Sequence, residues 1–134
     1  MNKFKIILIS LFSQVVYAAN PTVCMNTISG NFCIELFQDT NPNTVANFLT
    51  YLDSGAYNNM VFHRSIDSFV IQGGGYTINN NQGALDLTQI TKNNSVANEV
   101  YYSNTRGTVA MAKVGGDPDS ASSEWFINMA DNSA

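Results

Sequence analysis

Apolar residues occur along the chain in short runs separated by turn residues, a pattern typical of a mainly β protein. The segments PTVCMN and NFCIEL, on either side of residues 27–30, predict a hairpin. Further strands are predicted at residues 61–62, 69–74, 106–114 and 124–130. Short strands with many turns favour an antiparallel β-barrel or sandwich with helices packed outside it.

One segment has helical periodicity instead. Its apolar positions are Val45, Phe48, Leu49 and Leu52. Asn43 or Thr44 can cap the start of a helix, and Gly55 can end it. We therefore predict a helix over residues 45–55.

Two polar segments predict loops. Residues 76–98 are rich in asparagine and only weakly periodic, so a long loop is expected there. Residues 115–123, GGDPDSASS, predict a second loop. The final DNSA is a turn-like stretch directly after a predicted strand, which would leave an open sheet edge. We therefore expect the sequence to be truncated at its C-terminus.

Composition limits the function classes. The chain has 134 residues, 45% of them hydrophobic, which suits one domain with its own core. Its net charge is −4, and its six basic residues are scattered. Nucleic-acid binding needs clustered Lys and Arg to neutralise phosphates, so we expect no nucleic-acid partner.

The first twenty residues have the pattern of an export signal. Two lysines precede the apolar run from Ile6 to Phe12, and small residues allow cleavage after Ala18. A buried strand or a membrane anchor are the alternatives, but this run is too short for about 30 Å of hydrocarbon. We predict a signal peptide at residues 1–18 and an exported domain at 19–134. For a bacterial source the location is the periplasm, without membrane insertion after cleavage.

Export makes the two cysteines informative, since an oxidising compartment allows a disulfide. A tight turn at residues 29–30 would place Cys24 opposite Glu35, whereas a loop over residues 27–30 would place it opposite Cys33. The alternative is two small buried apolar side chains. Both interpretations stay open at this point.

The stretch FHRSIDSFVIQGGG, residues 62–75, resembles the signature of the cyclophilin-type peptidyl-prolyl cis-trans isomerases, which is approximately F-H-R-x-I-x-x-F-x-x-Q-G-G. RGTVAMAKVGGDPDSASSEWFINMADN is similar to the second conserved block of that family, and NPNTVANFLTYLDSGAYNN to its first helix. Membership would imply an eight-stranded antiparallel barrel capped by helices, with a groove on its outer face. In this chain the C-terminal strands and helix of that barrel would be missing.

The resemblance also implies a site. Arg64 and Gln72 would be the catalytic residues, with the guanidinium acting on the twisted amide and Gln72 steadying it. The substrate-binding positions implied are His63, Phe69, Val70, Met111, Ala112, Lys113 and Phe126. His63 could be a general base, but the isomerisation transfers no proton, so a hydrogen-bonded structural role is preferred. Glu124-Trp125 departs from the usual Gln-Phe and puts a carboxylate near the groove, which would either change the substrate preference or pair with Lys113.

Other chemistry is weakly supported. No G-K-[ST] follows Gly73–Gly75, so a tight turn is preferred over a phosphate loop. Asn128 stands where a calcium loop starting at Asp117 would need Glu, so no metal and no cofactor are expected. A hydrolase would need a nucleophile elbow and a histidine base, and the elbow motif is absent.

The function implied is peptidyl-prolyl isomerisation that assists folding after export. The partners would be unfolded or proline-containing polypeptides, and cyclosporin-like compounds are further candidate ligands of a monomeric protein. One alternative is a non-catalytic, chaperone-like fragment that only holds proline peptides. Another is a fragment that does not fold stably, because an open barrel exposes strand edges.

Overall fold

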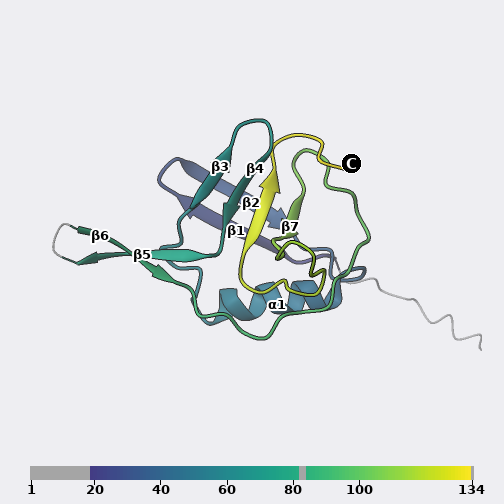
Figure 1. Ribbon diagram of the computed structural model, residues 1–134, viewed down its shortest axis with the longest axis horizontal. Coiled ribbons are helices and arrows are strands. Elements are labelled where there is room, and N and C mark those ends of the chain that lie inside the picture. The colour runs from purple at the N-terminus through teal and green to yellow at the C-terminus, as the bar shows by residue number, and fades with distance from the viewer. Residues whose placement is uncertain (1–18, 82–83, 134) are drawn as a thin grey trace, which may run out of the picture.

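The computed structural model describes residues 19–81 and 84–133, so the predicted signal peptide lies outside the described residues. The described part contains one helix and eight short strands (Figure 1). These elements are β1 Thr22–Thr27, β2 Gly30–Glu35, α1 Pro42–Asp53, β3 Arg64–Ile66, β4 Val70–Gly73, β5 Tyr76–Asn81, β6 Ala84–Gln89, β7 Val109–Met111 and β8 Trp125–Asn128. No helix of this part is long and apolar enough to cross a membrane.

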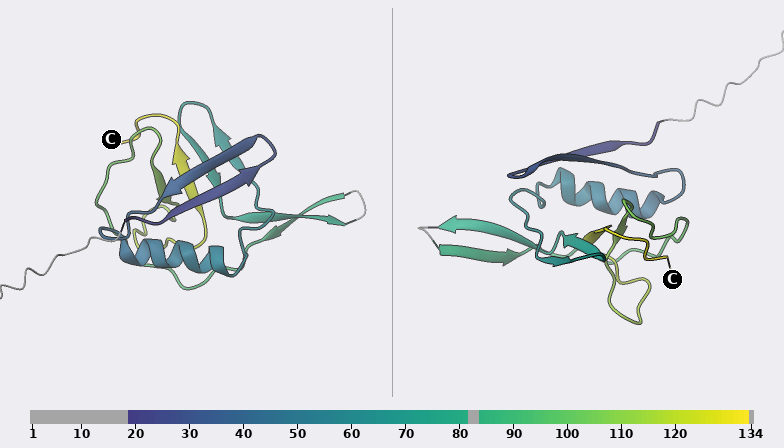
Figure 2. Two further views of the ribbon diagram at one scale, coloured as in Figure 1. Left: turned by 180° about the vertical axis from the view of Figure 1, so that it is seen from behind. Right: turned by 90° about the horizontal axis from the view of Figure 1, so that it is seen from above.

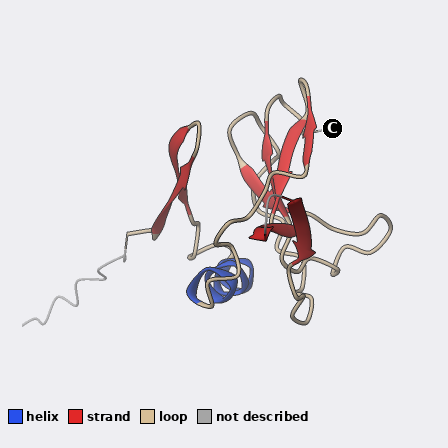
Figure 3. Ribbon diagram, turned by 90° about the vertical axis from the view of Figure 1, so that its left-hand side faces the viewer, coloured by secondary structure: helices blue, strands red, loops and turns tan. Residues whose placement is uncertain are grey.

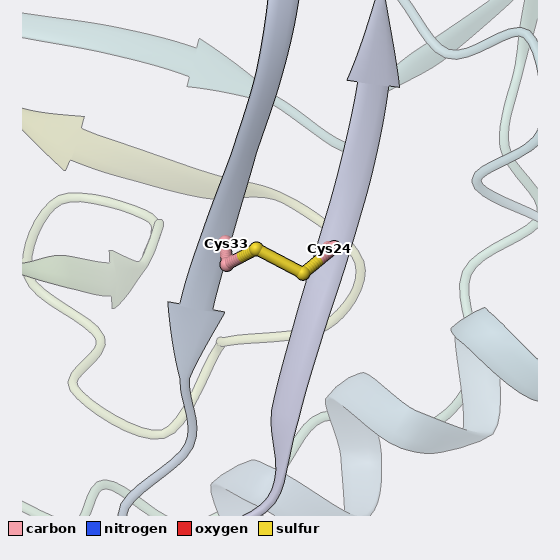
Figure 4. Close-up of a disulfide and its surroundings, with 2 residues drawn as sticks. All are labelled: Cys24 and Cys33. Atoms are coloured by element: carbon pink, nitrogen blue, oxygen red, sulfur yellow. A yellow bond between two sulfur atoms is a disulfide. The ribbon is translucent and has the colours of Figure 1, made fainter.

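Strands β1 and β2 form the predicted hairpin. Thr27 pairs with Gly30 across the turn, which places Cys24 opposite Cys33, and the two cysteines form a disulfide (Figure 4). Alternation along each strand turns both cysteines to the exposed face of the hairpin. The apolar face, which includes Ile34, packs on the core. The disulfide therefore joins the strands from outside, and the cysteines are not buried apolar side chains.

The central sheet has the strand order β3-β4-β8-β7, and every pair in it is antiparallel. Its two faces are distinct, because side chains alternate along each strand. On one face Trp125, Met111 and Val109 belong to the core or pack against it. The other face carries the row Arg64, Gln72, Phe126 and Ala110, which are directly opposite one another on neighbouring strands.

The core lies between this sheet, the β1–β2 hairpin and α1. Figure 3 shows the helix across one end of the space between hairpin and sheet. The buried cluster draws on all three parts and consists of Ile34, Leu36, Val45, Phe48, Tyr51, Tyr57, Ile90 and Trp125. Val45 and Phe48 are buried, as predicted from the helical spacing, whereas Leu49 and Leu52 are only partly buried. Tyr51, which was not among the predicted positions, is buried as well. The helix thus closes one open end of the β layers.

The N-terminus of α1 differs from the prediction. The helix begins at Pro42 instead of residue 45, because proline is well suited to the first helical position. Asn41 is the N-cap residue but makes no side-chain capping bond. Glu99 caps the helix instead, accepting hydrogen bonds from the backbone N–H groups of Asn43 (3.1 Å) and Thr44 (2.8 Å).

The loop predicted over residues 76–98 is wrong in its first half. Strands β5 and β6 pair antiparallel there and project away from the rest of the protein (Figures 1 and 2). The apolar alternation of these strands is confined to the short stretches 76–79 and 85–88, and polar residues separate the two, so the pattern is weak in the sequence. Asparagine and threonine side chains stabilise the pairing, as in the 2.9 Å bond from Asn79 Nδ2 to Thr88 Oγ1.

Three other strand predictions are confirmed, and so is the mainly β, antiparallel fold. Strands β4, β7 and β8 lie inside the predicted segments 69–74, 106–114 and 124–130. The strand predicted at residues 61–62 instead begins at Arg64, since Val61 only donates a backbone bond to Tyr76. The described strands form three sheets of two, four and two strands.

Candidate functional site

The row Arg64–Gln72–Phe126 defines the candidate site. These three residues come from β3, β4 and β8, and antiparallel pairing places them side by side on one face of the sheet. Arg64 Nη1 donates a 3.1 Å hydrogen bond to Oε1 of Gln72. This bond uses one of the five N–H donors of the guanidinium, so further donors can face a ligand.

Phe69 lies under the guanidinium of Arg64, with 5.7 Å between Arg64 Cζ and the ring centroid. Phe69 as a whole residue is 41% exposed. The backbone at Phe69 is held firmly, because its carbonyl accepts hydrogen bonds from Met129 N (2.8 Å) and Asn132 Nδ2 (3.0 Å). Together Arg64 and Phe69 form a cationic donor next to an exposed aromatic face.

Glu124 stands beside the row, immediately before β8. Its Oε2 accepts a 2.8 Å hydrogen bond from Gln72 Nε2 and lies 3.4 Å from His63 Nε2, while Oε1 lies 3.0 Å from Lys92 Nζ. The expected pairing of Glu124 with Lys113 is wrong, because Lys113 Nζ bonds to Asn98 Oδ1 at 3.1 Å.

The charges around Glu124 determine its ionisation. Partial burial acts to raise the pKa of its carboxyl, but the ammonium of Lys92, the amide of Gln72 and the imidazole of His63 together outweigh burial. The pKa of Glu124 is therefore lowered, and the side chain is a carboxylate at neutral pH.

The segment that carries Glu124 is anchored from the helix side. Asn47 Nδ2 donates to the carbonyl of Ser122 (2.6 Å), and the hydroxyl of Tyr57 donates to the carbonyl of Ser123 (2.7 Å). Burial, with Tyr51 nearby, raises the pKa of Tyr57 and keeps its hydroxyl a donor. The backbone N–H of Ala112 donates to the carbonyl of Glu124 at 2.8 Å. The position of Glu124 thus depends on the core packing.

His63 is not placed as a substrate contact. Its side chain is 17% exposed, its Nε2 faces Glu124, and its ring packs edge-on to Tyr76 with 5.1 Å between centroids. Its Nδ1 is buried without a hydrogen-bond partner. This arrangement favours the structural role over that of a general base.

Two further residues predicted to bind substrate, Val70 and Met111, do not lie in the row Arg64–Gln72–Phe126. Val70 is only 2% exposed and offers almost no surface to a ligand. Met111 packs against the core cluster, on the opposite face of the sheet from Arg64. The sequence could not reveal this, because a motif names residues without saying which face of a strand they occupy. Ala112 and Lys113 directly follow β7, at the edge of the sheet nearest Ala110.

A cavity of about 1010 Å³ lies beside Phe126. It is lined by residues of β2, α1 and β7 and by the segments 96–100 and 113–118, among them Lys113. A volume of this size is at the upper end for small-ligand sites. Phe126 and Ala110 belong both to the row and to the lining of this cavity, and Met111 lines it as well.

The profile of the family described as cyclophilin type peptidyl-prolyl cis-trans isomerase/CLD matches residues 22–134. The chain belongs to this family. A curated relative, a peptidyl-prolyl cis-trans isomerase of Acinetobacter baylyi, is 40% identical over 132 residues, covering 98% of the chain and 67% of the relative. The peptidyl-prolyl cis-trans isomerase B of Escherichia coli is 44% identical over 110 residues, covering 82% and 63%.

Solved structures of cyclophilins resemble the fold. A Cryptosporidium parvum cyclophilin, crystallised in the presence of the dipeptide Ala-Pro, superposes with a TM-score of 0.67 at 27% identity. The match covers 84% of this chain and 70% of that one. The chain spans about two thirds of the length of the curated relatives that it matches.

Two features of this cyclophilin were missed in the sequence. Lys92 contacts Glu124 although 32 residues separate them, and it follows the β6 strand that the polar pattern concealed. Trp125, the second residue of the departure Glu124-Trp125, is fully buried and packs against Phe48 and Phe62 with centroid distances of 6.2 and 5.7 Å. Trp125 therefore fills the core, and only Glu124 changes the candidate site.

Proposed function

We propose that the chain is a peptidyl-prolyl cis-trans isomerase that accelerates rotation about Xaa-Pro bonds in exported, folding polypeptides. The uncatalysed barrier is about 18–20 kcal/mol because amide resonance must be lost. The rotation breaks no covalent bond, so a catalyst needs only to stabilise the twisted amide, whose nitrogen carries a localised lone pair.

The arrangement of Arg64, Gln72 and Phe69 carries this proposal. Gln72 and the ring of Phe69 hold the guanidinium at the exposed face, where an N–H can be aimed at the amide nitrogen of a bound proline. A charge-assisted hydrogen bond contributes about 1.5–3 kcal/mol. Since each tenfold of rate requires about 1.4 kcal/mol, Arg64 supplies one to two decades and positioning of the peptide supplies the rest.

Apolar surface for the proline ring supports the same substrate class. Phe69 is exposed beside Arg64, and Phe126 joins the row to the adjacent cavity. A cyclophilin relative was crystallised with Ala-Pro. By analogy, we propose that the ligand is a proline-containing segment of an unfolded polypeptide.

The proposed location outside the cytoplasm has two supports. The first is the export-like pattern of residues 1–18. The second is the Cys24–Cys33 disulfide, a bond that persists in oxidising compartments such as the periplasm. A fusion of residues 1–30 to a reporter that is active only after export tests the location, and a reporter retained in the cytoplasm would contradict it.

The activity is tested by the isomerisation rate of a proline tetrapeptide with the purified chain and with Arg64→Ala. We expect the variant to lower kcat/KM by at least about tenfold. Equal rates for the two proteins would remove Arg64 from the mechanism. No acceleration by the unaltered chain would refute the activity of this chain.

Binding without catalysis is the second candidate function. The cavity beside Phe126 favours it, because an apolar pocket can hold a proline ring without help from Arg64. Titration of the same tetrapeptide separates the two functions. Saturable binding with no rate acceleration would support a proline-peptide binder.

A further inference from the structure

Glu124 and Gln72 form a directional pair next to Arg64. An ionised carboxylate can only accept hydrogen bonds, whereas an amide side chain has one donating and one accepting end. Because Gln72 Nε2 donates to Glu124 at 2.8 Å, its Oε1 must point the other way. That oxygen accepts the 3.1 Å bond from Arg64. The charge of Glu124 thereby determines which end of Gln72 the guanidinium meets.

The reverse orientation of the amide is unfavourable on both sides. If Gln72 turned over, its oxygen would face the carboxylate and its N–H groups would face the guanidinium. Both of these contacts are repulsive, and neither pair could form a hydrogen bond. A protonated Glu124 can itself donate, so it would accept the reversed amide and loosen the hold on Arg64.

The groups around Glu124 keep it ionised. Lys92, which follows β6, lies 3.0 Å from Oε1, and His63, which precedes β3, lies 3.4 Å from Oε2. Tyr76 of β5 packs against His63, and Arg64 of β3 reaches the carboxylate only through Gln72. No second acid contacts Glu124 among the interactions of the described residues.

The backbone leaves Glu124 little freedom to move away. Its carbonyl is held by the N–H of Ala112, and the next residue, Trp125, is fully buried. A Cβ built on Gly75 would lie 3.2 Å from Cδ of Glu124 and 2.8 Å from Cε1 of His63, so these side chains pack closely against that glycine. The carboxylate is therefore placed by the fold.

We propose that Glu124 is a positioning residue, whose carboxylate orients the amide of Gln72 and through it the guanidinium of Arg64. This inference rests on the proposed function only for its effect on rate. The orientation itself is a property of the folded chain.

The orientation is tested by NMR of the Gln72 side-chain amide in the purified chain between pH 3 and 8. We expect its signals to titrate with a midpoint below the ordinary glutamate value of 4.5. The inflection should vanish in Glu124→Gln, which cannot ionise, and persist in the matched control Glu99→Gln. An inflection that survives Glu124→Gln but disappears in His63→Gln would assign the titration to the imidazole and overturn the proposal.

The effect on rate is tested with the tetrapeptide at the same pH values. Glu124→Ala should lower kcat by about tenfold with little change in KM, because the twisted amide loses its aligned donor. Glu124→Gln can donate as well as accept, like the protonated acid, so it should show at every pH the reduced rate that the unaltered chain shows only in acid. Unchanged kcat and unchanged Gln72 signals in Glu124→Ala would overturn the positioning role. An unaltered chain that shows the Gln72 titration but no isomerase activity supports the positioning role and refutes only the proposed function.

Discussion

The guanidinium of Arg64 lies over the ring of Phe69, with 5.7 Å between Cζ and the ring centroid. A planar guanidinium can stack on a ring while its fixed fork of donors bonds to Gln72, whereas the ammonium of lysine is a compact point charge without that fork. We therefore expect Arg64→Lys to lower kcat/KM about tenfold in the tetrapeptide assay although the charge is kept. A variant with full activity would show that charge alone suffices.

Phe126 and Met111 lie on opposite faces of the central sheet, so their truncation should have different effects. Phe126→Ala removes apolar surface at the site and should lower kcat/KM by about tenfold or more. Met111→Ala should cost about 2 kcal/mol of unfolding free energy, at the low end for buried methionine because the side chain is half-buried. Tetrapeptide kinetics and urea unfolding of both variants give the comparison. If Met111→Ala lost activity without losing stability, Met111 would have to be a substrate-binding residue instead of a core residue.

Glu99 caps α1 from 55 residues away in the sequence. Partial burial acts to raise the pKa of the Glu99 carboxyl. The hydrogen bonds from Thr44 and Asn43 outweigh this effect, so the pKa is lowered. A lowered pKa means that the cap stabilises the fold above the unfolded-state pKa and is lost as pH falls through the folded-state pKa. Glu99→Gln should therefore cost about 1 kcal/mol at pH 7. Its difference from the unaltered chain in urea unfolding should shrink in acid, and a difference independent of pH would contradict the cap.

The disulfide on the outer face of the hairpin should add stability without specifying the fold. Cys24 and Cys33 are nine residues apart. Closing so short a loop in the unfolded chain corresponds to about 2–3 kcal/mol. The double variant Cys24→Ser, Cys33→Ser should lose that amount in urea unfolding and keep its circular dichroism spectrum. Mass spectrometry of the unreduced, alkylated chain should show no alkylated cysteine, and two alkylated cysteines would disprove the bond.

Gly74 permits a close approach between β4 and the segment before β8. Its φ is +78°, and an added Cβ would lie 2.4 Å from the carbonyl oxygen of Ser123. Gly107 has a similar φ of +87° but open space around it. Gly107→Ala should thus cost only the backbone strain, about 1–2 kcal/mol. Gly74→Ala should cost clearly more in urea unfolding, and equal losses would show that the contact with Ser123 relaxes freely.

Local patterns in the sequence predicted the elements in which buried positions recur at the regular spacing of a helix or a strand. The spacing of Phe48 and its apolar neighbours predicted α1, and the run that ends at Gly73 predicted β4. The motif around Arg64 placed Phe69 and Gln72 in the site, because all three lie within nine residues. The β5–β6 hairpin was missed because each strand has only a short apolar alternation, at residues 76–79 and 85–88, with an asparagine-rich polar stretch between them.

The sequence by itself therefore determined the class of fold, the family resemblance and the identity of the chemical groups at the site. Only the tertiary structure decided their partners. Glu124 meets Lys92 instead of Lys113, and Met111 faces the core, because strand order and register set which distant side chains adjoin and which face each occupies. Short-range spacing in a sequence carries no information about contacts across tens of residues, since those depend on how the sheets assemble.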